Sequence, residues 1–227
     1  MPVYNEEANI TKVITEWMNA FSQQQVSSRM IAVNDGSTDT TLAALKKLQE
    51  RFPDRLLIID KPNSGHGQSC RTGYDAAVAQ QPSWIFQIDS DGQCDPVFFS
   101  SFWAKRNEAD CIFGFRVRRD DGALRLLVSK CASILTSILT GRDLKDANVP
   151  YRMVRRGALE RALANVPKDF DIQNIALTLA LKRDRTLRWA YVPIRFRARQ
   201  GGSNSINLPK IAKMGLRMLS QIHNVGK

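Results

Sequence analysis

The stretch that decides the fold reads Ser-Trp-Ile-Phe-Gln-Ile-Asp-Ser-Asp-Gly-Gln-Cys-Asp-Pro, residues 83–96. Its first half is a short apolar run that is typical of a buried strand. Asp89 and Asp91 follow directly, and Gly92 permits a turn. Ligands of open α/β sheets bind at the carboxyl ends of strands, where carboxylates and substrate phosphates suit Mg²⁺ or Mn²⁺. The competing interpretation is an ordinary polar turn.

The charge of the chain indicates an anionic partner. Among 227 residues, 33 are Lys or Arg and 22 are Asp or Glu, which gives a net charge of +11. Such an excess suits nucleic acid, a phosphorylated small molecule or an acidic membrane surface. The carboxylate-rich loops would repel the phosphates of a nucleic acid, so we expect no nucleic-acid partner.

The cysteines and the apolar runs predict where the protein acts. Cys70, Cys94, Cys111 and Cys131 show no CxxC spacing, so we expect reduced thiols in the cytoplasm. No apolar run reaches the roughly 18 residues of a membrane-spanning helix. Any membrane contact is therefore expected to be peripheral, at the cytoplasmic face.

Helices and strands alternate along the first part of the chain. A helix follows Asn5, its expected N-cap, and its core-facing stripe consists of Ile10, Val13, Ile14, Trp17, Met18 and Phe21. Strands are predicted at 30–33 and 56–59, with a helix at 42–52 between them. This alternation predicts βαβ units and a mostly parallel sheet flanked by helices.

A glycine-bearing loop at 63–68 precedes another predicted helix at 69–80. Backbone N–H groups at a helix start can cradle phosphate. His66 lies in this loop, and a solvated side chain is the commoner role for such a histidine than catalysis.

The second half continues with predicted helices at 97–107, 124–139 and 172–181 and a strand at 110–115. A strand at 187–196 contains Pro193, which favours the edge of a sheet. Alternate residues of a strand share a face, so Arg195, Arg197 and Arg199 are predicted to line one wall. The segment 208–225 is predicted to form an amphipathic helix that either caps the core or lies on a membrane surface.

Several motifs occur together in a fixed order: Pro2-Val3-Tyr4-Asn5-Glu6-Glu7, Val33-Asn34-Asp35-Gly36-Ser37-Thr38-Asp39, the loop with Asn63, Gly65 and Gly67, and Asp89-Ser90-Asp91. This set resembles the family 2 glycosyltransferases of GT-A fold. Later pieces are similar to the polyprenyl-phosphate (dolichol-phosphate) mannosyltransferase-like branch: Phe113 to Arg116, the helix with Arg125, Ser129 and Lys130, Asp146 to Arg152, and Arg199 to Ser205.

The resemblance implies one GT-A domain over 1–227. Residues 1–115 form its nucleotide-binding half, 116–207 its acceptor-side half and 208–227 its C-terminal helix. The positions that match donor-nucleotide contacts are Pro2, Tyr4, Glu6, Asp35 and Asp89. The positions that match metal contacts are Asp89, Asp91 and Gln93. The positions that match contacts to the diphosphate and the acceptor phosphate are Arg116, Arg125, Ser129 and Arg199; with Asp89 and Asp91, the three arginines form the expected catalytic set.

The implied activity is an inverting, metal-dependent transfer of a hexose from a GDP- or UDP-sugar to an acceptor, a polyprenyl phosphate at the membrane surface. A phosphate acceptor is already anionic and needs no general base. A saccharide hydroxyl, as in cell-surface polysaccharide synthesis, would need one, and Asp146, Asp169 and Asp171 are the candidates. Two further hypotheses are a nucleotide-sugar-binding protein without turnover and a nucleotidyltransferase, which would carry a basic glycine-rich loop where Asn5-Glu6-Glu7 stands.

The chain departs from the family pattern at two places. Family members usually carry an apolar strand before the Pro-x-Tyr-Asn-Glu motif, and here Met1 stands where that strand should end. The first strand is therefore predicted to be missing. The mannosyltransferases also carry an acid in a Gln-x-Glu context after Phe170, where this chain has Asp171-Ile172-Gln173-Asn174. Because of this difference, the resemblance does not determine the donor sugar or the acceptor.

Overall fold

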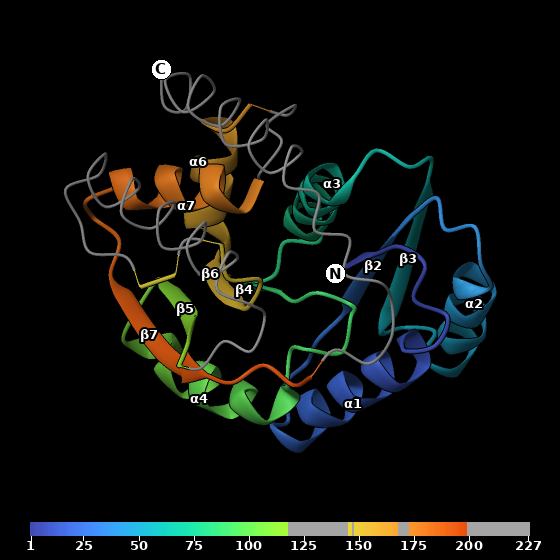
Figure 1. The fold of residues 1–227 in the computed structure, drawn as a ribbon. Helices are drawn as coiled ribbons and strands as arrows, with labels where there is room; N and C mark the ends of the chain where they lie inside the picture. The colour runs from blue at the N-terminus through green and yellow to red at the C-terminus, as the bar shows by residue number, and fades with distance from the viewer. Residues whose placement is uncertain (118–144, 147, 168–172, 199–227) are drawn as a thin grey trace.

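The computed structural model describes residues 1–117, 145–146, 148–167 and 173–198. Their strands form two sheets, one with the order β1-β2-β3 and one with the order β4-β6-β5-β7. Helices α1 and α4 cover one side of the strands, and α3, α6 and α7 cover the other (Figure 1). The predicted arrangement of a sheet between helices is confirmed, although the described strands divide into two sheets.

The first sheet is wholly parallel. It contains β1 (Pro2–Val3), β2 (Met30–Asp35) and β3 (Leu56–Lys61). The helices that connect and follow these strands are α1 (Ile10–Gln23), α2 (Thr41–Arg51) and α3 (His66–Ala79). The predicted βαβ alternation is therefore correct.

The second sheet is mixed. Its strands are β4 (Trp84–Gln87), β5 (Cys111–Arg116), β6 (Arg152–Arg155) and β7 (Trp189–Ile194). Strand β6 runs antiparallel between β4 and β5, and β7 pairs parallel with β5. Pro193 lies on β7, which forms the edge as its proline predicted. Strand β6 was not predicted from the sequence.

The helices of the second half differ in detail from the prediction. The segment predicted as one helix at 97–107 consists of a 3₁₀ turn at Pro96–Phe98, helix α4 (Phe99–Ala104) and a 3₁₀ turn at Lys105–Asn107. Helix α6 (Arg156–Ala164) follows β6 directly, and α7 (Gln173–Arg183) matches its prediction. The predicted helices at 124–139 and 208–225 lie outside the described residues.

An aromatic cluster joins α1 to the second sheet. Trp17 is 1% exposed, and its ring centroid lies 5.4 Å from Phe86 on β4 and 5.7 Å from Tyr151 before β6. Phe99 on α4 closes the cluster with a T-shaped contact to Phe21 at 4.9 Å. Such ring pairs contribute about 0.5–1.5 kcal/mol each beyond their buried area. The cluster therefore anchors the second sheet to α1.

The first strand consists of only two residues, Pro2 and Val3, where the sequence predicted that it is missing. Pro2 and Val3 pair with Val33 and Asn34, and the Val33 N–H donates to the Met1 carbonyl at 2.9 Å. Backbone hydrogen bonding to β2 needs no particular side chains, so even two residues adopt the strand.

Candidate active site

The loops that follow β1 and β2 are joined by hydrogen bonds. The backbone N–H groups of Asn5, Glu6 and Glu7 donate to side chains of the second loop, namely Ser37 at 3.0 Å, Thr41 at 2.8 Å and Asp39 at 3.3 Å. In return, the Glu7 carboxylate accepts from the hydroxyl and the N–H of Thr40 at 2.6 and 3.0 Å, which lowers the pKa of Glu7. The two motifs therefore form one rigid unit.

This unit changes a role predicted from the sequence. Asn5 is not the N-cap of α1, because that helix begins at Ile10 with Asn9 before it. Asn5 has a positive φ of 52°, and its side-chain oxygen accepts from the Thr38 N–H at 2.9 Å. Glu7 lies at the N-terminus of α2, where a negative charge complements the helix dipole.

Asp35 ends β2 and is almost fully enclosed by donors. One carboxylate oxygen accepts from the Ser64 N–H at 2.9 Å and forms an ion pair with Lys61, and the other accepts from the Gly65 N–H at 2.9 Å. Burial disfavours its charge, but Lys61, Ser64 and Ser69 together lower the pKa of Asp35 below its ordinary value of 3.8. Asp35 is therefore an ionised carboxylate that orders the loop before α3.

Gly36 is required for this arrangement. It has a φ of 65°, and a Cβ atom at this position would lie 2.7 Å from the backbone nitrogen of Asn63. The side chain of Asn63 in turn donates to the Asp35 carbonyl at 2.9 Å. A glycine is thus the residue that lets the loops after β2 and β3 touch.

The loop after β4 presents the paired carboxylates that the sequence predicted. Asp91 accepts a hydrogen bond from the Gln93 N–H at 3.1 Å, and Gly92 between them has a φ of 76°. Asp89 is different, because its Oδ1 is buried and accepts no hydrogen bond from the described residues. The Nε2 atom of His66 lies 3.8 Å from this oxygen.

The N-terminus of α3 lies between the two acidic loops. The Gly65 N–H bonds to Asp35, and the next residue, His66, faces Asp89. Burial raises the pKa of Asp89, while His66 opposes that shift. Cys70, whose sulfur lies 3.5 Å from His66 Nε2, and Asp89 raise the pKa of His66 to about 10. The site therefore contains a buried carboxylate oxygen that accepts no hydrogen bond from the described residues and lies beside the His66 imidazole.

Arg197 fixes the Asp91 loop from outside. Its backbone N–H donates to the Gln93 carbonyl at 3.0 Å, and its guanidinium bonds to Glu16 at 2.5 Å and Asp95 at 2.8 Å. Strand β7 ends at Ile194, so Arg195 and Arg197 are not on a strand, and the predicted strand-borne wall of arginines is wrong in this respect. The Asp95 and Glu16 carboxylates explain why the Arg197 side chain turns toward the protein.

Arg116 at the end of β5 holds Asp146. The two side chains form a bidentate pair with distances of 2.8 and 3.1 Å, and the Asp146 side chain is 1% exposed. The guanidinium also stacks over the Phe196 ring at 5.3 Å. Asp146 was one of three candidate general bases, and this arrangement makes it a buried partner of Arg116.

The other predicted site residues lie at the edge of the same loops or outside the described part of the chain. Tyr4 is 47% exposed at the end of β1, Pro2 is buried, and Glu6 accepts from the Asn9 side chain at 3.0 Å. Gln93 lies in the Asp91 loop. The predicted site residues Arg125, Ser129 and Arg199 lie outside the described residues, as do the candidate bases Asp169 and Asp171.

The described residues contain no cluster of three or more His, Cys, Asp or Glu side chains that could hold a metal ion by themselves. Asp89 and Asp91 nevertheless fit a magnesium- or manganese-type ion, because such ions use one or two carboxylates together with substrate phosphates. The buried Asp89 oxygen without a donor is the specific feature that suits such a ligand.

Two participants in the site were not predicted from the sequence. Lys61 was not considered, although it ends the strand next to β2 and can reach Asp35 across the parallel pair, where Asp35 lies opposite it. His66 was weighed as a solvated side chain, and its side chain is 55% exposed, yet it faces Asp89. The only signal for it was its place at the helix start.

The chain matches known proteins over most of its length. The model of Glycosyl transferase family 2 matches residues 1–163. A dodecaprenyl-phosphate galacturonate synthase of Rhizobium johnstonii is 30% identical over 165 residues, which cover 71% of this chain and 48% of the relative. A polyprenol monophosphomannose synthase of Mycolicibacterium smegmatis is 29% identical over 168 residues, 71% of this chain and 62% of the relative. The chain thus spans about half to three fifths of the length of these relatives.

Solved structures support the same fold. Glucosyl-3-phosphoglycerate synthase from Mycobacterium tuberculosis, in complex with Mn²⁺, UDP and phosphoglyceric acid, superposes with a TM-score of 0.68. The match covers 97% of this chain and 76% of that protein, at 19% identity. This likeness shows a shared fold.

No helix in the described part of the chain is both long enough and apolar enough to cross a bilayer. Three observations indicate the same family: the ordered motifs, the two acidic loops beside α3, and the family model that matches residues 1–163. The chain therefore belongs to glycosyltransferase family 2.

Proposed function

We propose that the protein transfers a sugar from a nucleotide-diphospho-sugar, with inversion, to a polyprenyl phosphate at the cytoplasmic face of a membrane. The observation that carries this proposal is the buried Asp89 oxygen, which lacks a hydrogen-bond donor among the described residues and lies beside Asp91 and the start of α3. A carboxylate in this state is unfavourable until a ligand or ion pairs with it.

The donor would occupy the edge where the loops after β1, β2 and β4 meet. Pro2, Tyr4, Glu6 and Asp35 are the proposed nucleotide contacts, and residues 1–115 the donor half. Tyr4 is exposed there and is available to contact the nucleobase of the donor. Asp35 already accepts from Lys61 and two N–H groups, so its proposed part is to hold this edge in shape as well as to contact the nucleoside.

Mg²⁺ or Mn²⁺ would be held by Asp89 and Asp91, with Gln93 beside them, and would neutralise charge that develops on the leaving diphosphate. Arg116, Arg125, Ser129 and Arg199 are the proposed contacts to the diphosphate and the acceptor phosphate, on the acceptor half 116–207. Arginine is suited to this because its guanidinium binds phosphate oxygens in pairs.

The state of Asp146 favours a phosphate acceptor over a saccharide hydroxyl. A hydroxyl acceptor needs a general base, and Asp146 is buried and bidentate with Arg116. The names of the relatives point the same way, since two of them are synthases of polyprenyl-phosphate sugars. A nucleotide-sugar-binding protein without turnover is the second candidate, favoured by the division of the sheet beneath the donor edge.

The test is calorimetric titration with UDP and GDP, each with and without Mn²⁺, on the chain and on Asp91→Ala. We expect metal-dependent binding of one nucleotide at micromolar affinity and loss of its metal dependence in Asp91→Ala. Glu160→Ala is the control, because Glu160 lies on α6 and pairs with Arg156 on the surface. Unchanged affinity in Asp91→Ala would refute the metal assignment.

Transfer is measured in a second step with polyprenyl phosphate and with a free oligosaccharide as acceptors. Sugar transfer to the lipid phosphate alone supports the proposal. Transfer to the oligosaccharide alone would refute the acceptor class, and nucleotide binding without any transfer would favour the binding protein.

A further inference from the structure

The pair of Arg116 and Asp146 leaves the end of β5 without net charge. The two side chains are joined by two hydrogen bonds, at 2.8 and 3.1 Å, and they are 12% and 1% exposed. A guanidinium that already holds a carboxylate in this way offers fewer donors and no excess charge to a second anion. If this strand end is to hold a phosphate, another cation has to contribute.

Lys145 is such a cation. It directly precedes Asp146 in the chain and is exposed. Its ammonium lies 4.3 Å from the centroid of the Phe115 ring and 5.6 Å from the centroid of the Tyr191 ring. Among the described residues, Lys145 forms no ion pair with a carboxylate. The described part of the chain therefore does not neutralise the charge of Lys145, in contrast to that of Arg116.

Two aromatic rings determine where this ammonium lies. Phe115 on β5 pairs with Pro193 on β7, two residues after Tyr191, so the side chains of all three share one face of the sheet. Tyr191 in turn stacks on Trp189, with the ring centroids 6.3 Å apart. An ammonium that is held over rings keeps its three N–H donors for other partners. The lysine is thus ordered before a ligand arrives, which lowers the entropic cost of binding.

Exposed apolar side chains continue the same face of the sheet. Strands β5 and β7 lie side by side (Figure 1), and the Val117 N–H donates to the Ile194 carbonyl at 3.1 Å, so their pairing extends to Val117. Val117 lies two residues after Phe115 and is 63% exposed. Pro193, opposite Phe115, is exposed as well. A cation beside exposed apolar surface suits a phosphate group that is attached to a hydrocarbon chain.

The end of β5 is connected to the loop of the paired carboxylates. Arg116 lies over the Phe196 ring at 5.3 Å, and the next residue, Arg197, donates its backbone N–H to the Gln93 carbonyl at 3.0 Å. Gln93 belongs to the Asp91 loop. A ligand at the end of β5 would therefore lie on the same edge of the sheet as the proposed donor.

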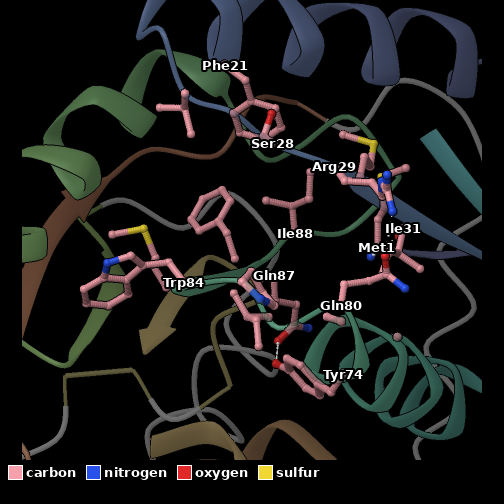
Figure 2. A pocket seen from close by; sticks show the side chains of 18 of the residues that line it. Met1, Phe21, Ser28, Arg29, Ile31, Tyr74, Gln80, Trp84, Gln87 and Ile88 are labelled. Carbon is pink, nitrogen blue, oxygen red and sulfur yellow. Dashed lines mark hydrogen bonds between the residues drawn. The ribbon is translucent and has the colours of Figure 1, made fainter. Parts of the chain in front are cut away.

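The cavity of about 750 Å³ between β2 and β4 is less suited to an anion. Figure 2 shows that Tyr74 and Gln87, on its wall, are bonded to each other. Arg29, which also lines it, donates to the Gln80 side chain at 2.6 Å. These polar groups already have partners, whereas the Lys145 ammonium has no hydrogen-bond acceptor among the described residues.

We propose that Lys145 binds the phosphate group of the acceptor lipid, and that Val117 and Pro193 contact the hydrocarbon next to that phosphate. The inference rests on the proposed function, since it takes a polyprenyl phosphate as the acceptor, and it names side chains that select this class. Lys145 orients an oxygen that is already anionic, so no proton is transferred. A saccharide has neither the charge for Lys145 nor the chain for Val117 and is not held here.

The test measures binding of the chain to phosphatidylcholine vesicles that carry farnesyl phosphate, farnesol or phosphatidylglycerol. We expect the tightest binding to farnesyl phosphate. Lys145→Gln should weaken it at least about tenfold, because a charge-assisted hydrogen bond is lost. Lys145→Arg should retain it, since a guanidinium also lies well over aromatic rings. Val117→Asn should weaken it about threefold. Lys47→Gln is the control, because it removes the same charge from an exposed lysine on α2.

Three results would overturn the proposal. Unchanged binding in Lys145→Gln would mean that Lys145 does not contact the lipid. An equal loss in Lys47→Gln would mean that only the net charge matters. An equal dependence on Lys145 with phosphatidylglycerol would mean a contact to anionic lipids in general. Vesicle binding needs no nucleotide, and Lys145→Gln should bind UDP or GDP with Mn²⁺ as the unchanged chain does. Failure of donor binding or of transfer would therefore be seen separately from failure of this site.

Discussion

The loops after β2 and β4 each place a carboxylate beside the start of α3, in opposite surroundings. Asp35 receives two backbone N–H groups and Lys61, and its pKa is lowered. Asp89 has a buried oxygen without a donor from the described residues, and its pKa is raised. A fully paired carboxylate stabilises the fold, whereas one that lacks partners is available to a ligand. The first loop therefore serves mainly structure and the second mainly chemistry.

The largest expected effect is on stability at the first loop. Asp35→Asn leaves Lys61 without its charge partner and weakens the bonds from Ser64 and Gly65. We expect the free energy of unfolding to fall by about 3 kcal/mol, since breaking one partner of a buried pair is costly. Chemical denaturation measures this. The control is Glu160→Gln, whose exposed pair with Arg156 should contribute less than about 1 kcal/mol; equal losses would remove the distinction.

The second loop should respond in the opposite way. Asp89→Asn removes a charge that burial disfavours, so the free energy of unfolding at pH 7 should stay the same or rise. Metal-dependent nucleotide binding should fall at least tenfold, which is about 1.4 kcal/mol. Denaturation and calorimetry on the same variant give both numbers. A variant that is strongly destabilised and binds normally would reverse the roles of the two carboxylates.

The pH dependence sharpens the same comparison. The folded-state pKa of Asp35 is below its ordinary value of 3.8, so its contribution to stability is present above that value and is lost as pH falls through the lower, folded-state pKa. The stability difference between the wild type and Asp35→Asn should therefore be constant from pH 7 to about 5 and shrink below about 4. Denaturation curves at several pH values test this, and a difference that grows on acidification would contradict it.

The smallest expected effect concerns Arg197, which holds the Asp91 loop in place. Arg197→Met removes the bonds to Glu16 and Asp95 and should cost about 1 kcal/mol, because the guanidinium is partly exposed. Arg195→Met is the matched control, since Arg195 is exposed; we expect a change within about 0.5 kcal/mol. If both variants lose the same stability, Arg197 does not hold the Asp91 loop in place.

Local sequence patterns predicted much of the fold and part of the site. The stripe from Ile10 to Phe21, the strands around 30–35, 56–61 and 84–87, and the edge position of Pro193 follow from periodicity and turn residues. Strand β6 was missed because its sequence, Arg-Met-Val-Arg, contains no apolar run, and because its pairing with β4 and β5 is set by contacts far away in the sequence. Lys61 was missed because its partner, Asp35, is also far away in the sequence.

The sequence by itself determined the alternation of elements, the acidic residues at the strand ends and the family resemblance, because these depend on the order and period of residue types. Only the tertiary structure decided which carboxylate is already paired, that Arg116 holds Asp146, and that the described strands divide into two sheets. These features depend on contacts between groups that are distant in the sequence. Such contacts form only in the folded chain, where buried polar groups must be hydrogen-bonded.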